Sequence, residues 1–202
     1  MKVAVLAVQG AFIEHEQILK KLGADVVELR KKEDIEVMED IDSSTGVGGK
    51  YDALVLPGGE STVQSKLLRE LDMFDILKYQ IVHGLPVLAT CAGMILLAEN
   101  IANDERTGFQ TIPMTVRRNA YGRQLGSFAA EEEFKYVGRY PFRFIRAPYV
   151  EQVEDGVEVL ATVEDKIVAV KYKNQMALAF HPELTENPSI HKMFLVDLVR
   201  NK

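Results

Sequence analysis

Short apolar runs alternate with amphipathic segments in the first half of the chain, and this alternation restricts the possible folds more than any other feature. The apolar runs lie at residues 3–8, 52–56 and 87–90, and residues 25–29 are expected to form a further strand. Residues 12–22, which precede Gly23, and residues 73–82 have helical periodicity, and Ser61 with Gln64 predicts a capping box at another helix start. Continuous apolar runs predict strands covered on both faces. We therefore expect an α/β fold, a doubly wound and mostly parallel sheet with helices on both faces.

Shorter strand-like segments follow one another after about residue 107. They lie at residues 110–116, 142–145, 157–163 and 167–172. This pattern predicts an antiparallel extension in the second half, which leads back to a core strand at residues 175–180. Residues 189–199 predict a final amphipathic helix. Because 202 residues suit one well-buried core and no internal repeat is present, we expect a single domain over residues 1–202.

Composition excludes several classes of protein. The formal net charge of −6 argues against nucleic-acid binding, which usually needs a basic excess. No apolar run approaches the ~20 residues of a membrane span, and the N-terminus becomes polar too quickly for a signal peptide. One cysteine cannot form an internal disulfide, so a cytoplasmic location is expected. Because four histidines and one cysteine show no ligand spacing, we expect no metal and no cofactor.

Cys91, the single cysteine, stands where the apolar run at residues 87–90 gives way to a helix-like segment. An apolar strand that ends in small residues around a central nucleophile is typical of a nucleophile elbow. The sharp turn forces strained backbone angles on the nucleophile, so its neighbours must be small. A buried core cysteine explains this segment equally well, because free cysteine is among the most buried residue types.

His181 and Glu183 follow the strand-like run at residues 175–180. Residues two apart in extended backbone project to the same side, so Glu183 is expected to lie against the ring of His181. A thiol nucleophile needs a base, and that base needs a third group to fix its tautomer. Taken alone, a surface histidine with a chance acidic neighbour is the simpler explanation. Together with Cys91, the pattern favours a Cys–His–Glu triad.

A glycine-rich turn at residues 57–61, Pro-Gly-Gly-Glu-Ser, follows the apolar run at residues 52–56. Ligand sites gather at the carboxyl ends of strands in such sheets, so this turn, Cys91 and His181 should converge. The amides of Gly59 and Ala92 are then the candidate oxyanion hole. An ordinary turn between strand and helix is the alternative. A phosphate site is less consistent with the sequence, because the G-x-G-x-x-G spacing and the Walker lysine are missing.

Motifs along most of the chain resemble one protein family. Thr90-Cys91-Ala92-Gly93, together with His181-Pro182-Glu183, looks like a class I (triad) glutamine amidotransferase domain. The resemblance narrows to the glutaminase subunit of pyridoxal 5′-phosphate synthase. The blocks that carry it are residues 6–15, 56–62, 118–124 (Arg-Asn-Ala-Tyr-Gly-Arg-Gln), 144–148 (Phe-Ile-Arg-Ala-Pro) and 181–185. The blocks at 118–124 and 144–148 are the specific signals, because the triad alone indicates only the superfamily.

The resemblance implies a flavodoxin-like fold and a glutaminase activity. Cys91 would attack the side-chain amide of L-glutamine, His181 would pass a proton to the departing ammonia, and Glu183 would orient His181. The residues implied to hold the glutamine are Gly59, Glu60, Ser61, Arg118, Ile145 and Arg146. Surface ion pairing is the alternative for the two arginines. Because Arg117 precedes Arg118, a displacement by one position is also possible.

A partner is implied by the same resemblance, namely a synthase subunit that receives the ammonia internally and makes pyridoxal 5′-phosphate. Gln9, Gly10 and His15 lie near the expected docking edge, although packing and turn formation also explain them. No nucleic acid and no membrane is expected as a partner. Two features depart from the family pattern. Ala89 stands where the family usually has glycine, and residues 39–50 are predicted to form a loop insertion.

Two other functions stay open from the sequence. One is an amidotransferase that serves another acceptor, such as a histidine or tryptophan precursor, against which the block at residues 118–124 argues. The other is a non-catalytic, flavodoxin-like binding module with an inert cysteine. A thiol of that kind would react slowly with an amide-mimicking electrophile at neutral pH.

Overall fold

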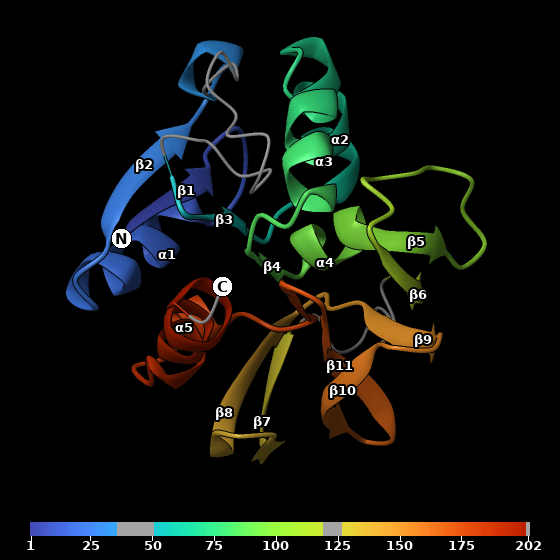
Figure 1. The fold of residues 1–202 in the computed structure, drawn as a ribbon. Helices are drawn as coiled ribbons and strands as arrows, with labels where there is room; N and C mark the ends of the chain where they lie inside the picture. The colour runs from blue at the N-terminus through green and yellow to red at the C-terminus, as the bar shows by residue number, and fades with distance from the viewer. Residues whose placement is uncertain (36–50, 119–126, 201–202) are drawn as a thin grey trace.

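A ten-stranded sheet organises the computed structural model, which describes residues 1–35, 51–118 and 127–200 (Figure 1). The strand order is β2-β1-β3-β4-β12-β11-β9-β6-β5, and β10 pairs with β11. The parallel core consists of β1 (Lys2–Leu6), β2 (Asp25–Leu29), β3 (Ala53–Leu56), β4 (Val87–Thr90) and β12 (Gln175–Leu178). Every residue of β3, β4 and β12 is buried, which explains why their sequences are almost continuously apolar.

Helices cover both faces of this core. They are α1 (Phe12–Lys21), η1 (Lys32–Asp34), α2 (Ser61–Glu70), α3 (Phe74–Val82), α4 (Ala92–Leu97), η2 (Pro182–Leu184) and α5 (Ser189–Met193), which continues as the π-helix η3 (Phe194–Arg200). Helix α1 packs on β1 and β2, whereas α4 packs on β3, β4 and β12. The connection from β1 to β2 and the connection from β3 to β4 run in opposite directions along the sheet, so right-handed crossovers put their helices on opposite faces. The predicted doubly wound sheet is confirmed.

The antiparallel extension predicted for the second half is also present. Strand β11 (Lys166–Tyr172) runs antiparallel to β12, to β10 (Glu158–Val163) and to β9 (Tyr149–Val153). Strand β9 also pairs antiparallel with β6 (Ile112–Arg117), which in turn pairs in parallel with β5 (Ala98–Ile101). Strands β7 (Ser127–Phe134) and β8 (Gly138–Ile145) form a separate ribbon below the sheet in Figure 1.

An aromatic cluster attaches this ribbon to the core next to the site. The rings of Phe142 and Phe180 meet edge to face with centroids 4.6 Å apart, and Phe144 lies against Phe180 at 5.9 Å. The backbone N–H of His181 donates to the carbonyl of Arg143 at 2.8 Å. The end of β8 is thereby fixed beside the segment that follows β12.

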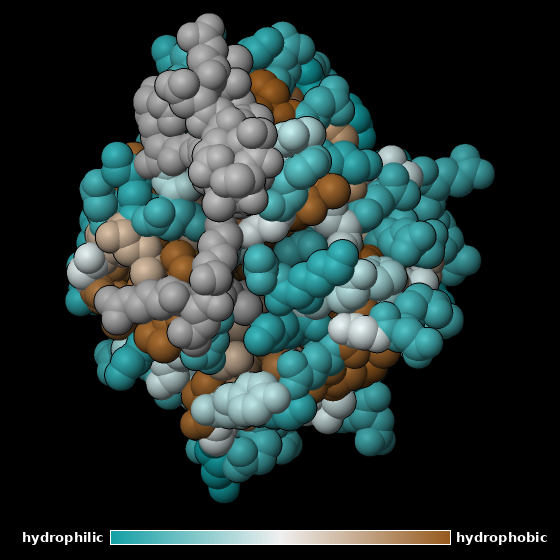
Figure 2. All heavy atoms as spheres, in the orientation of Figure 1, coloured by the Kyte–Doolittle hydropathy of each residue, from teal (hydrophilic) through white to brown (hydrophobic). Residues whose placement is uncertain are grey.

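Hydrophilic residues cover most of the molecular face in Figure 2, where hydrophobic residues form only small patches. In the three described parts of the chain, no helix is long and apolar enough to span a membrane. The predicted loop insertion at residues 39–50 lies entirely outside the described residues, as do residues 119–124 of the block that begins at Arg118.

Candidate active site

Cys91 occupies a sharp turn between β4 and α4. Its φ of 48° and ψ of −98° lie outside the regions that non-glycine residues normally adopt. A Cβ on Gly93 would lie 2.3 Å from the carbonyl oxygen of Leu56, so only glycine lets α4 pack this closely on β3. Ala89 is fully buried within β4 and pairs with both neighbouring strands, so its methyl group belongs to a regular strand ahead of the turn. The geometry is that of a nucleophile elbow.

His181 and Glu183 form a buried pair next to this cysteine. Nδ1 of His181 lies 2.6 Å from Oε1 of Glu183, which belongs to η2. Burial by itself would lower the pKa of His181, but hydrogen bonds with Cys91 and Glu183 and the charges of both raise it to about 10. His181 is only 5% exposed, so the interpretation as a surface histidine is wrong.

The carboxylate of Glu183 lies deep in the interior. Burial opposes its negative charge, but the neighbouring His15 and His181, together with the hydrogen bond from His181, hold the pKa of Glu183 below its ordinary value. A charged carboxylate therefore faces a charged imidazole, an arrangement that orients the ring and keeps a proton on Nδ1.

The end of β8 completes the surroundings of Cys91. The sulfur of Cys91 lies 3.9 Å from the carbonyl oxygen of Ile145. Arg146, the next residue, has an exposed side chain and a φ of 45°, and non-glycine residues with such angles gather at functional sites. Of the residues predicted to hold glutamine, Ile145 is thus placed beside the sulfur, and Arg146 follows it in the chain.

The turn after β3 fits closely against His181 and Gln9. A Cβ on Gly58 would lie 2.3 Å from Cε1 of His181, and one on Gly59 would lie 2.4 Å from Oε1 of Gln9. The same Gln9 oxygen accepts the backbone N–H of Glu60 at 2.9 Å. Both glycines are therefore required by close approaches to other segments, which an ordinary turn would not need.

The helix that begins at Ser61 is not capped as predicted. Glu60 occupies the N-cap position, and no side chain caps the helix, so the predicted capping box is wrong. The side chain of Gln64 instead donates to the carbonyls of Gln9 at 3.0 Å and of Pro57 at 3.2 Å. Gln64 thereby holds the turn after β3 against the turn after β1.

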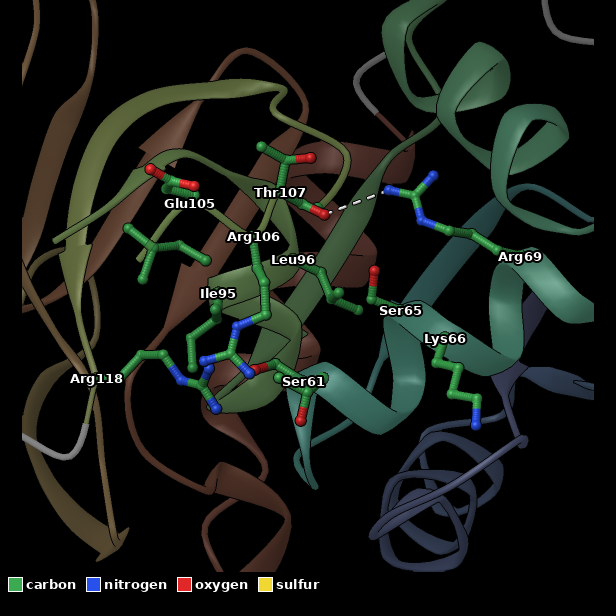
Figure 3. A pocket seen from close by; sticks show the side chains of 13 residues that line it. Ser61, Ser65, Lys66, Arg69, Ile95, Leu96, Glu105, Arg106, Thr107 and Arg118 are labelled. Carbon is green, nitrogen blue, oxygen red and sulfur yellow. Dashed lines mark hydrogen bonds between the residues drawn. The ribbon is translucent and has the colours of Figure 1, made fainter. Parts of the chain in front are cut away.

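A cavity of about 420 Å³ opens between α2, α4 and the segment that follows β5 (Figure 3). Ser61 and Arg118, both predicted to hold glutamine, line it together with Ile95. Nη1 of Arg118 lies 3.1 Å from Oδ2 of Asp104, and Arg106 binds the same carboxylate. The Arg106 hydrogen bonds hold the pKa of Asp104 well below its ordinary value, despite burial and with help from Arg118. Asp104 therefore stays charged and fixes both guanidinium groups.

Arg117 points elsewhere. Its Nη2 lies 2.7 Å from Oε1 of Glu151, and both side chains are more than a third exposed. Arg118 therefore lines the cavity, whereas Arg117 forms a surface ion pair.

Comparison with known proteins assigns this chain to a family. The model of the SNO glutamine amidotransferase family matches residues 5–200. The chain belongs to this family. Pyridoxal 5′-phosphate synthase subunit PdxT of Desulfitobacterium hafniense (strain Y51) is 58% identical over 195 residues, which are 96% of this chain and 92% of that protein. The same subunit of Haemophilus influenzae (strain PittGG) is 49% identical over 96% of this chain and 97% of its own.

Solved structures agree with the assignment to the SNO glutamine amidotransferases. A crystal structure of a glutamine amidotransferase superposes with a TM-score of 0.86 at 40% identity, covering 98% of both chains. Another glutamine amidotransferase, from Thermotoga maritima, has a TM-score of 0.62 at 15% identity over 100% of this chain and 84% of its own, which supports the fold alone. The predicted family and the flavodoxin-like fold are confirmed.

Several residues of this SNO glutamine amidotransferase hold the predicted site residues in place but were not themselves predicted from the sequence. Asp104, which binds Arg118, is one of them. Thr90 and His191 are two more, and both contact His15 in the interior. His15 was predicted near a docking edge, but its ring is fully buried, so the ring itself is no part of a surface. The only sequence signal for these partners is that the chain has just four histidines, so each of them is a candidate for a specific role.

Proposed function

We propose that this chain is the glutaminase subunit of a pyridoxal 5′-phosphate synthase, which hydrolyses L-glutamine and supplies ammonia for vitamin B6 biosynthesis. One observation carries the proposal. The buried imidazole of His181, held by Glu183 at 2.6 Å, lies beside a cysteine at a nucleophile elbow. One PdxT subunit is 58% identical in sequence to this chain, and this similarity supports the choice of pathway.

The reaction that this site supports has two halves. The Cys91 thiolate attacks the side-chain amide carbon of glutamine, and the imidazolium of His181 gives its proton to the amide nitrogen. The C–N bond breaks, ammonia leaves, and a glutamyl thioester remains on the sulfur. Neutral His181 then removes a proton from water, whose oxygen attacks the thioester carbon. The C–S bond breaks, glutamate leaves, and the thiolate–imidazolium pair is restored, while Glu183 holds Nδ1–H throughout.

We assign the remaining roles by position. The amides of Gly59 and Ala92, at the ends of β3 and β4, are the proposed donors to the oxyanion of each tetrahedral intermediate. The guanidinium of Arg118 suits the substrate α-carboxylate, because its planar fork binds a carboxylate in two places. The other proposed glutamine contacts are Glu60, Ser61, Ile145 and Arg146. Ser61 at the cavity and Ile145 beside the sulfur support these assignments.

Ammonia delivery requires a partner. Free ammonia is protonated and lost in water, so the proposed assembly is a hetero-oligomer in which a synthase subunit receives it internally. We infer that the chain works as one domain over residues 1–202 and in the cytoplasm. The absence of any pair of cysteines supports the reducing compartment.

Cys91→Ala in complex with the synthase subunit tests the function. Synthesis of pyridoxal 5′-phosphate should stop when glutamine is the nitrogen source and continue when ammonium salt replaces it. His83→Ala, which removes an exposed imidazole, is the matched control and should support both reactions. Glutamine-driven synthesis by Cys91→Ala would contradict the nucleophile. Ammonia release from glutamine that never leads to pyridoxal 5′-phosphate would favour another acceptor.

A further inference from the structure

The second carboxylate oxygen of Glu183 faces a buried polar cluster that the reaction above does not use. Nε2 of His15 lies 3.3 Å from Oε2 of Glu183 and 3.1 Å from Oγ1 of Thr90. Nδ1 of His15 lies 3.0 Å from Nε2 of His191. The side chains of His15, Thr90 and His191 are fully inaccessible to solvent. A buried row of polar groups therefore extends from the candidate triad into the interior.

Four separate elements supply this cluster. His15 comes from α1, Thr90 from the end of β4, Glu183 from η2 and His191 from α5, which lies next to α1 in Figure 1. No group of three His, Cys, Asp or Glu side chains in the described parts of the chain is arranged to hold a metal ion. Buried polar groups are costly unless they are paired. Neither packing nor metal binding therefore explains why these four polar side chains meet in the interior.

The protonation states of the two histidines follow from their surroundings. Burial lowers the pKa of His15, although Glu183 acts in the opposite direction, and burial lowers the pKa of His191 to about 3. Both rings are therefore neutral at neutral pH, and each carries one N–H. Ionised Glu183 can only accept a hydrogen bond. The proton of His15 consequently lies on Nε2, since a bare Nε2 would face the carboxylate with its lone pair.

The position of the proton on His191 follows from the position of the proton on His15. With its own proton on Nε2, His15 has a bare Nδ1, which accepts the Nε2–H of His191. The remaining atom, Nδ1 of His191, is then unprotonated, and it has no hydrogen-bond partner among the described residues. A lone pair without a donor at Nδ1 of His191 is what this arrangement of protons predicts. The donors thus point in one direction, from His191 through His15 to Glu183.

We propose that His15, backed by His191, is a positioning residue that holds the carboxylate of Glu183 against His181. Two different oxygens of Glu183 are involved, since Oε1 binds His181 and Oε2 faces His15. Fixing Oε2 stops the carboxylate from rotating away when the imidazole changes charge between the two halves of the reaction. The 3.3 Å contact falls short of hydrogen-bond geometry, and Oε2 of Glu183 has no hydrogen-bond partner among the described residues, so Nε2 of His15 faces this oxygen as a charge–dipole contact while it bonds Oγ1 of Thr90. This inference rests on the proposed glutaminase function.

Two amide substitutions at position 15 separate positioning from folding. A glutamine amide reaches about as far as the Nε2 of histidine, so His15→Gln keeps a donor toward Glu183. An asparagine amide reaches only about as far as Nδ1, so His15→Asn keeps the contact with His191 alone. A hydrogen bond to a charged group is worth enough for kcat of His15→Asn to fall about tenfold. His15→Gln should stay within about threefold of wild type, and neither variant should change KM for glutamine by more than about twofold.

The assay measures ammonia release from glutamine in the complete complex with the synthase subunit, together with thermal unfolding of each variant. Equal kcat values for the two variants, at equal unfolding temperatures, would overturn the inference. If His15→Asn does not fold, His191→Leu and His191→Gln replace the pair. The leucine variant should lower kcat about threefold and the glutamine variant should restore it, whereas equal rates would overturn the inference.

The same experiment distinguishes this inference from the proposed function. A wild-type complex that releases no ammonia from glutamine would contradict the function itself. A wild-type complex that hydrolyses glutamine, loses this activity in Cys91→Ala and shows no difference between His15→Gln and His15→Asn would contradict only the role of His15.

Discussion

Gly58 lies directly against the ring of His181, and a Cβ on residue 58 would come within 2.3 Å of Cε1 and 3.0 Å of Nδ1. The ring has little freedom to move aside, because it is 5% exposed and bound to Glu183 at 2.6 Å. The turn after β3 and the histidine after β12 therefore fit each other although they are far apart in sequence. The glycine is required by this contact.

Gly58→Ala should displace the ring of His181 and lower kcat for glutamine hydrolysis by about 100-fold or more, since small errors in the placement of catalytic groups have large effects on rate. Gly23→Ala is the control, because Gly23 has a φ of 82° and nothing within 4 Å of an added Cβ. That variant should lose stability and keep kcat. Ammonia release and thermal unfolding measure the two effects. Wild-type kcat in Gly58→Ala would show that the ring can move without consequence.

Much of the fold was predictable because its signals are local. Strand β4 was predicted with its observed bounds because it is fully buried and its sequence is almost continuously apolar, and the bounds of β2, which is mostly half-buried, were predicted as well. Strand β7 was missed because it is mostly exposed and includes three consecutive glutamates, so it has no clear alternation of polar and apolar residues. Strands β5 and β9 were missed as well. Their pairing depends on distant segments that a single window of sequence does not contain.

The site was predictable to the extent that each residue stands at the end of a strand. Cys91 and His181 follow β4 and β12, and the parallel pairing of these strands brings the two residues together. The partners of predicted residues were not predictable, because they come from other elements. Gln64 had the spacing of a helix cap, but its side chain bonds the turn after β1 instead. His15 and His191 meet only when α1 and α5 pack together.

Arg118→Lys and Arg117→Lys test which arginine binds the substrate. A lysine at position 118 loses the planar fork, so KM for glutamine should rise about tenfold while kcat changes little. The same change at position 117 affects only an exposed ion pair with Glu151, and it should leave KM within about twofold. Glutamine titrations of ammonia release by both complexes measure the difference. Equal KM values in the two variants would contradict the assignment of Arg118.

Gln64→Met should destabilise the protein by removing the amide that holds two turns together. The variant leaves the carbonyls of Gln9 and Pro57 without this donor in a buried setting, which costs about 1–3 kcal/mol of unfolding free energy. Gln17→Met is the matched control on the exposed side of α1 and should change the unfolding free energy by less than about 0.5 kcal/mol. Urea denaturation measures both values. Similar losses in the two variants would mean that the Gln64 contacts contribute nothing specific.

Acid should destabilise the protein partly through His191. Its pKa is about 3 in the folded protein, lowered by burial from the ordinary value of 6.5. Below pH 6.5 the unfolded chain therefore binds a proton at this residue that the folded protein does not bind. Proton binding stabilises the unfolded state more strongly as the pH falls. The free energy of unfolding therefore decreases by about 1.4 kcal/mol per pH unit because of this group. The effect extends from about pH 6 down toward pH 3, and it is absent above neutral pH.

His191→Gln removes this titration and retains an amide donor toward His15. Its free energy of unfolding should fall less steeply than that of wild type between about pH 6 and 4, by about 1.4 kcal/mol per pH unit, because all other titrating groups are common to both proteins. Urea denaturation at a series of pH values measures the two slopes, and His83→Gln controls for the loss of an exposed imidazole. Parallel slopes for wild type and His191→Gln would mean that His191 takes up its proton while the protein stays folded. A charged His191 would then donate from both nitrogens, and the one-directional order of donors from His191 to Glu183 would no longer follow.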